Sequence, residues 1–248
     1  MSLKDRNLTE NQPSIITVVG VGGGGVNAVS NMYGQNVSFA ICDDDAEVLE
    51  KSPVPTKILL GKDGVGAQAG REQAEEAIDE IRATLNNGAK IVLLAAGMGG
   101  GTGTGATPVI AKELDAIKVA IVTIPFQFEG QQRIKQAREG IIELKKYVDF
   151  LLVIDNEKLR ENYGDLKIGE AFSKADSVLT SAVKCIAEQI SLSGENRERE
   201  AIETAMKSLR LEYKNIVVNM GNSDFLRYFG KIRNFLKRFF VYYGIVNI

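Results

Sequence analysis

Apolar residues in the first two thirds of the chain gather in short runs, each followed by a polar or glycine-rich segment and then by a helical pattern. The runs cover residues 15–21, 37–42, 56–60, 90–94, 119–126 and 149–154. Continuous apolar runs of this length are typical of strands that are buried on both faces. Strands that alternate with helices at this spacing predict an α/β fold, a parallel Rossmann-like sheet with helices on both faces and right-handed crossovers.

Apolar residues at helical spacing predict the helices. We expect one amphipathic helix over 71–87 and another from 131 to about 147. The segment 168–190 has an apolar face wide enough for a long, buried central helix. Beyond it the pattern predicts further elements in the order helix, strand, helix, strand, over 193–209, 215–220, 223–238 and 239–246.

Three glycine-rich turns follow the first, third and fourth predicted strands, at residues 20–25, 61–70 and 97–105. The last contains six glycines in nine residues. Because glycine costs roughly 0.5–1 kcal/mol relative to alanine in ordinary structure, we expect a functional reason for it. Free N–H groups, together with the positive end of a helix beginning near Thr107, would form an anion site suited to a polyphosphate. Ligands of such sheets bind at the carboxyl ends of the strands, where all three turns lie.

Composition narrows the possible chemistry. The 248 residues are 44% hydrophobic with a net charge of −2, which indicates one large domain or a domain with a smaller appendage. With no histidine in the chain, histidine-based triads and histidine metal sites are excluded. A basic group near the C-terminus is interpreted as one face of an amphipathic helix, so we expect no nucleic-acid partner. This group consists of Lys231, Arg233, Lys237 and Arg238.

Cysteine usage and hydropathy favour a cytoplasmic protein. Cys42 and Cys185 lie in apolar surroundings far apart in sequence, as reduced core thiols do. No apolar run reaches the ~18–20 residues of a membrane span, and residues 1–7 lack a signal-peptide core. We therefore expect cytoplasmic localisation, no membrane insertion and no side-chain metal site.

The first glycine turn is compatible with a second class of protein. Gly20, Gly22 and Gly25 satisfy the dinucleotide fingerprint G-x-G-x-x-G, and the acids of residues 43–45 follow about 20 residues later, where that motif binds ribose. An NAD- or FAD-dependent oxidoreductase is thus an alternative, although it leaves residues 99–105 unexplained and supplies no proton donor. The same acids could instead cap the helix that begins at Ala46.

The sequence Gly-Gly-Gly-Thr-Gly-Thr-Gly at residues 99–105 resembles the signature loop of the tubulin/FtsZ family, and residues 95–108 are more similar to the bacterial FtsZ members than to tubulin. The resemblance extends over residues 15–190 and returns at 193–208. It implies a GTP-binding domain (14–167), a central helix (168–190) and a shortened α+β C-terminal domain (191–248). Residues 1–13 are polar, and we expect them to form a flexible N-terminus.

The resemblance also implies a GTP/GDP site, with any Mg²⁺ held mainly by the phosphates. Its glycine turns would hold phosphate, Asn27 and Asp176 would read the guanine, Phe172 would stack on the base, and Glu129 and Arg133 would lie at the ribose. Without the resemblance, Phe172 would be interpreted as a core aromatic and Asp176 as a surface acid. The implied nucleotide-binding residues are Gly22, Gly23, Gly24, Gly25, Asn27, Asp45, Gly99, Gly100, Gly101, Thr102, Gly103, Thr104, Glu129, Arg133, Phe172 and Asp176.

Two departures from the family pattern affect the expected activity. Where the family has Asn-Thr-Asp, this chain has Asp43-Asp44-Asp45, which should weaken anion binding unless a cation intervenes. After Ile190 the chain lacks the acidic loop that in FtsZ-like filaments reaches the nucleotide of the adjacent subunit, so no catalytic residue is identified.

We therefore expect an FtsZ-type GTP/GDP-binding cytoskeletal protein of bacterial cell division. It would assemble head-to-tail with itself, have other division proteins as partners, and hydrolyse GTP poorly. A nucleotide-binding scaffold without turnover is the alternative.

Overall fold

The computed structural model describes residues 14–219 except 62–63, 87, 165, 194–195 and 214–215. The strands in this part of the chain are β1 (Ile16–Val21), β2 (Ser38–Asp43), β3 (Thr56–Leu59), β4 (Ile91–Gly97), β5 (Ile117–Ile124), β6 (Phe150–Asp155) and β7 (Val217–Asn219). The helices are α1 (Gly22–Ser30), α2 (Ala46–Lys51), α3 (Ala67–Glu76), α4 (Ile78–Leu85), α5 (Gly101–Glu113), the 3₁₀ helix η1 (Gln127–Glu129), α6 (Gln131–Leu144), α7 (Asn156–Tyr163), α8 (Ile168–Leu192) and α9 (Glu198–Glu212).

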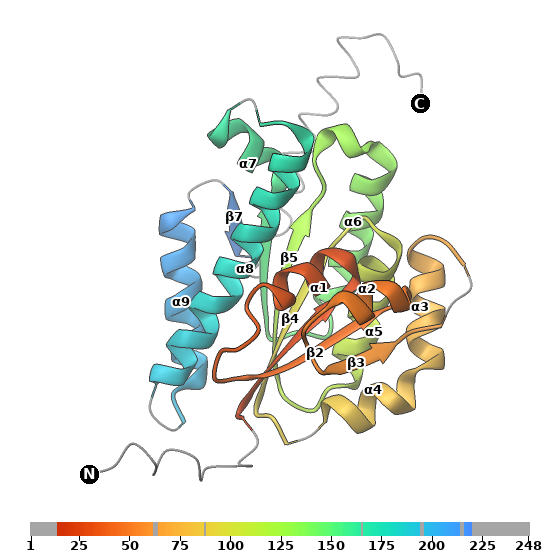
Figure 1. The fold of residues 1–248 in the computed structure, drawn as a ribbon. Helices are drawn as coiled ribbons and strands as arrows, with labels where there is room; N and C mark the ends of the chain where they lie inside the picture. The colour runs from red at the N-terminus through yellow and green to blue at the C-terminus, as the bar shows by residue number, and fades with distance from the viewer. Residues whose placement is uncertain are drawn as a thin grey trace.

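The strands form one sheet in the order β3-β2-β1-β4-β5-β6-β7 (Figure 1). Strands β1 to β6 run parallel, and β7 pairs antiparallel with β6. The predicted α/β class and parallel Rossmann-like sheet are confirmed. The strand order reverses between β1 and β4, whose carboxyl ends adjoin where Val21 pairs with Ala96. This switch point is where doubly wound sheets bind their ligands.

Alternate residues of each central strand face opposite helix layers. On β1, Ile16 and Val18 join the core beneath α1, α8 and α9, whereas Val19 and Val21 join the core beneath α3, α4, α5 and α6. Figure 1 shows α8 and α9 side by side on one side of the sheet and α3 and α4 on the other. Both faces of the sheet are therefore buried, which explains why the strands appear in the sequence as continuous apolar runs.

The glycine-rich turn after β4 is itself helical. The sequence predicts a helix start near Thr107, but α5 begins at Gly101 and contains Pro108 in its interior. The close packing of α5 on α3 explains this difference, because a Cβ at Gly105 would lie about 2.0 Å from the carbonyl oxygen of Ala67. Glycine here allows two helix backbones to touch, so tertiary packing overrides the low helix propensity of the segment.

Several element boundaries differ from the sequence prediction. The single helix predicted over 71–87 is two helices, α3 and α4, separated at Ala77, whose φ of −87° and ψ of 11° leave the helical region. Helix α7 was not predicted at all. The strand predicted over 215–220 is β7, and it extends the main sheet.

The long central helix is confirmed as α8, which runs two residues past the predicted end at 190. Helix α9, predicted over 193–209, starts at Glu198 and packs on α8. The predicted flexible N-terminus (1–13), the helix over 223–238 and the strand over 239–246 lie outside the described residues. Across the part of the chain that the structure describes, no helix has both the length and the apolar character that a membrane crossing requires.

Candidate functional site

Two glycine turns meet at the switch point with their backbones in contact. Gly22, the first residue of α1, has a φ of +68°, and a Cβ on it would lie about 2.7 Å from the backbone nitrogen of Gly103 in α5. A Cβ on Gly103 would lie about 2.4 Å from the carbonyl oxygen of Gly97. Side chains are excluded here by close approach of backbone to backbone, so the floor of the site is made of main chain.

Other glycines of the same turns face open space. A Cβ at Gly23 or at Gly100 would meet no heavy atom within 4 Å. Helices α1 and α5 start at these turns, and the first N–H groups of a helix have no partner inside the helix. The positive ends of two helices therefore converge at the β1–β4 edge, as a polyphosphate would require, with open space at Gly23 and Gly100. The residues present fit a nucleotide's phosphates.

Asn27 and Asp176 lie together on the α8 side of the site. The amide Nδ2 of Asn27 donates to Oδ2 of Asp176 at 3.4 Å, which joins α1 to α8. Burial raises the pKa of Asp176 above its ordinary value, while the hydrogen bond from Asn27 acts in the opposite direction. An amide and a carboxylate placed side by side offer both a donor and acceptors, which is the set that a guanine edge needs.

An aromatic group borders this pair. Phe126 is fully buried and stacks on Phe128 at a centroid distance of 4.9 Å. Phe172 of α8 meets both rings edge to face, at 5.4 and 5.9 Å. Because Phe128 and Phe172 remain 48% and 40% exposed, apolar ring surface is available to a planar ligand.

The turn η1 and the start of α6 complete the site next to the glycine floor. Oε2 of Glu129 accepts from Arg133 at 3.0 Å. Further along α6, Nε2 of Gln136 donates to the carbonyl oxygen of Gly100 at 3.1 Å. A Cβ on Gly99, whose φ is +106°, would lie 3.0 Å from the carbonyl oxygen of Arg133. Glu129 and Arg133 are thus held beside the turn between β4 and α5.

Contacts between successive elements close a ring around the switch point. In order they join α1 to α8, α8 to η1, η1 to α6, α6 to the turn before α5, and α5 back to α1. The pairs are Asn27–Asp176, Phe172–Phe128, Glu129–Arg133, Gln136–Gly100 and Gly103–Gly22. Residues from widely separated parts of the sequence therefore surround one edge of the sheet.

The three consecutive acids at the end of β2 have distinct surroundings. Asp45 is exposed and caps α2, accepting from the backbone N–H of Glu47 at 2.8 Å, so the capping alternative describes its geometry. Oδ1 of Asp44 accepts from the hydroxyl of Thr102 at 2.5 Å. Asp43 is 4% exposed, and burial, together with the neighbouring Asp44, raises its pKa to about 7.

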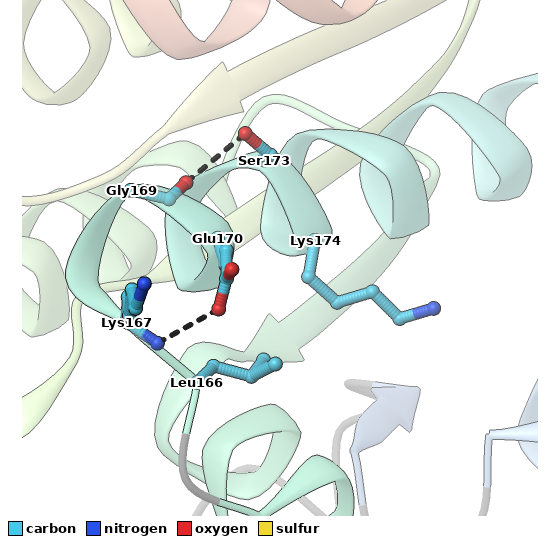
Figure 2. A pocket seen from close by; sticks show the side chains of 6 residues that line it. All are labelled: Leu166, Lys167, Gly169, Glu170, Ser173 and Lys174. Atoms are coloured by element: carbon cyan, nitrogen blue, oxygen red, sulfur yellow. Dashed lines mark hydrogen bonds between the residues drawn. The ribbon is translucent and has the colours of Figure 1, made fainter.

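A cavity of about 660 Å³ lies at the start of α8, lined by Leu166, Lys167, Gly169, Glu170, Ser173 and Lys174 (Figure 2). None of the glycine turns lines it. Glu170 accepts from the backbone N–H of Lys167 at 3.0 Å, and Ser173 donates to the carbonyl oxygen of Gly169 at 3.0 Å. Two of its polar side chains are therefore bonded to the backbone of the helix start, which distinguishes this cavity from the ring of contacts at the switch point.

Three polar residues of this edge escaped the sequence analysis. Gln136 gives no motif signal, and Asp44 was noted only as a member of an acidic run. Asn156, the first residue of α7, is 5% exposed, and its Oδ1 has no hydrogen-bond partner in the structure. Asn156 directly follows β6 at the carboxyl edge of the sheet, and this position could have identified it as a candidate site residue.

In this α/β domain two helices start at the switch point of the sheet, and backbone atoms line both starts. These features define the class of nucleotide-binding proteins. Residues 15–164 match the GTPase domain of the Tubulin/FtsZ family, and the chain belongs to this family.

Named relatives agree with this assignment. The cell division protein FtsZ of Porphyromonas gingivalis is 48% identical over 210 residues, which cover 79% of this chain and 46% of the relative. The FtsZ of Mycoplasmopsis pulmonis is 44% identical over 205 residues, covering 77% of this chain and 52% of the relative. The chain thus spans about half the length of these relatives.

A solved FtsZ dimer from M. jannaschii has a similar fold. It superposes with a TM-score of 0.69 at 38% identity, over 74% of this chain and 57% of that one.

Proposed function

We propose that this chain binds GTP and GDP at the β1–β4 edge and assembles head-to-tail with copies of itself as an FtsZ-type protein of bacterial cell division. The ring of contacts around the main-chain floor is the observation that supports it. In this proposal Gly22–Gly25 and Gly99–Thr104 hold the phosphates through backbone N–H groups, except that the N–H of Gly99 donates to the hydroxyl of Thr104. Any Mg²⁺ is held mainly by the phosphates.

The base and ribose would be read by side chains on the rest of the ring. Asp176 accepts from the guanine nitrogen donors, Asn27 reads the adjacent edge, and Phe172 stacks on the ring. Glu129 accepts from ribose hydroxyls while Arg133 lies near ribose and phosphate. A bound nucleotide would supply the scissile phosphate bond, and these residues would orient it and exclude water from the base.

Self-assembly would place two subunits around one nucleotide. A relative of known structure is described as a dimer, and head-to-tail contacts between identical subunits generate open filaments. The residues that bridge α8 and α9 are few, 193 to 197, and the sequence there lacks the family's acidic loop. A missing activating group costs ~10³–10⁵ in other GTPases, so we propose that hydrolysis is slow and that a binding scaffold without turnover is the second candidate.

The structure gives the acids at residues 43–45 surroundings that do not favour the dinucleotide alternative. Asp43 is buried, Asp44 is bonded to Thr102 and Asp45 caps α2. Asp43 is therefore withdrawn from solvent, and Asp44 and Asp45 are already hydrogen-bonded within the fold.

Isothermal titration calorimetry in magnesium buffer tests the proposal directly. We expect GDP and GTP to bind and ADP and NADH to bind at least ~100-fold more weakly, because a site built to hydrogen-bond one base rejects another. The variant Asp176→Asn exchanges an acceptor for a donor and should lose most of the GDP affinity without gaining ADP affinity. Absence of guanine-nucleotide binding by the wild-type chain would refute the proposed function.

A further inference from the structure

The 3₁₀ turn η1 carries Glu129 and Phe128 to the site, yet none of its three residues is buried. It contains two backbone–backbone hydrogen bonds, from the N–H of Glu129 to the carbonyl of Phe126 and from the N–H of Gly130 to the carbonyl of Gln127, both 3.1 Å. Hydrogen-bond geometry in 3₁₀ segments is poor. Something outside the turn must therefore hold it in place.

Two carboxylates bind the N-terminal N–H groups of this turn. Oε1 of Glu129 reaches back to the backbone N–H of Phe126 at 2.9 Å. Oε2 of Glu157, from α7, accepts from the backbone N–H of Gln127 at 3.0 Å. The first contact lies within the turn, so the second is the one that ties η1 to a separate element.

Glu157 is itself rigidly held. It is 6% exposed, its backbone N–H is bonded to Oδ1 of Asp155 at 3.0 Å, and its Oε1 accepts from Arg160, with Nη2 at 2.6 Å and Nε at 2.8 Å. A buried carboxylate that is both ion-paired and hydrogen-bonded is costly to disturb. Its second oxygen is thereby aimed at one N–H of η1.

We propose that Glu157 is a positioning residue of the nucleotide site, acting through η1 to place Glu129, Arg133 and Phe128. The inference rests on the proposed function, since it needs a ligand on that side of the ring. The path runs from α7 to Gln127, then from Glu129 to Arg133, and from Phe128 to the ring of Phe172 at 5.9 Å. Within the described residues, Glu157 makes no hydrogen bond to a glycine turn, so its effect falls on the ribose and base side.

The variant Glu157→Gln keeps the shape of the side chain but removes its charge and leaves one acceptor oxygen for two donors, the N–H of Gln127 and the guanidinium of Arg160. We expect the Kd for GDP to rise about tenfold, as for loss of a hydrogen bond to a charged group. The matched control is Glu161→Gln, on the same helix, whose carboxylate pairs with Lys158 at the surface at 2.5 Å. It makes the same charge change and should leave the Kd within about twofold.

A double variant separates positioning from general destabilisation. If Glu157 acts through η1, Glu157→Gln combined with Glu129→Gln will weaken GDP binding by clearly less than the product of the two single effects. Losses that multiply, or a Glu157→Gln protein that binds GDP like the wild type, would overturn the inference.

Gln127→Pro offers a second route should Glu157→Gln fail to fold. Proline at this first position of the turn, where proline is accepted, removes the N–H that donates to Glu157 together with the exposed Gln127 side chain. Glu157 and Arg160 themselves are kept. It should reproduce the loss of GDP affinity. A wild-type chain that binds no guanine nucleotide refutes the proposed function, whereas normal binding by both wild type and Gln127→Pro refutes this inference alone.

Discussion

Asp43 should make the stability of the fold depend on pH in an unusual direction for an acid. It is buried at the end of β2, Oδ1 accepts from the backbone N–H of Asp45 at 3.1 Å, and Oδ2 has no hydrogen-bond partner in the structure. Burial and the adjacent Asp44 raise its pKa to about 7. Because the neutral acid is the favoured form in the fold, its contribution is fully present below about pH 4 and is lost as the pH rises through 7.

The size of the effect follows from the pKa. A rise from 3.8 to about 7 corresponds to up to about 4 kcal/mol, at about 1.4 kcal/mol per pKa unit. Asp44 is partly exposed and shares the local charge with Asp43, so solvent screening reduces this figure and we expect roughly 2 kcal/mol. The variant Asp43→Asn removes the ionisation, and its amide can donate to the Asp44 carboxylate. It should be more stable than the wild type at about pH 8 by that amount and equally stable near pH 3, below the unfolded-state pKa.

Urea unfolding followed by far-ultraviolet circular dichroism measures this, since the chain has no tryptophan. Both pH values lie away from the sequence pI of about 5.5. A gain of roughly 2 kcal/mol moves the urea midpoint up by about 1 M. The control is Asp45→Asn, two residues further on. Asp45 is exposed, and asparagine keeps a good cap for α2. A gain that is the same at both pH values, or absent at pH 8, would refute the reasoning.

Three further outcomes are expected. Gly103→Ala should destabilise the fold by about 1–3 kcal/mol, because its Cβ would overlap the carbonyl of Gly97, and thermal unfolding measures the loss. Gly100→Ala, whose Cβ meets open space, should unfold like the wild type yet bind GDP at least ~10-fold more weakly in calorimetry; unchanged affinity would contradict the phosphate assignment. Cys42 is fully buried and burial raises the pKa of its thiol, so in a Cys185→Ser background disulfide-reagent titration should detect a thiol only after unfolding.

The layered sheet was predictable because buried parallel strands leave a direct trace in the sequence. The central helix was predictable for a similar reason, since its apolar face repeats over 168–190. The start of α5 was not, because proline normally marks a first helical turn and Pro108 instead lies inside the helix. The break at Ala77 was also hidden, since alanine is the best helix former and only packing makes it leave the helical region.

The candidate site divides in the same way. The glycine turns are visible in the sequence, and their meeting at the switch point follows from the topology of parallel strands. That Asn27 and Asp176, 149 residues apart, belong to one site came only from a resemblance, and the hydrogen bond between them is seen only in the structure. The contacts of Glu157 and Gln136 carry no sequence signal, because a hydrogen bond to a backbone group depends on where that backbone lies in space.

The main-chain floor at the switch point limits how such a site can diversify. Backbone N–H groups are the same whichever residue carries them. A side chain at Gly22 would displace α5, and one at Gly103 would displace the end of β4. Under the proposed function, exchanges on the floor would therefore abolish phosphate binding rather than adjust it. Selectivity, between relatives or toward an inhibitor, has to come from side chains one layer out, such as Asp44, Phe128 and Gln136. A compound intended to distinguish this protein from its relatives should reach past the phosphate position to that rim.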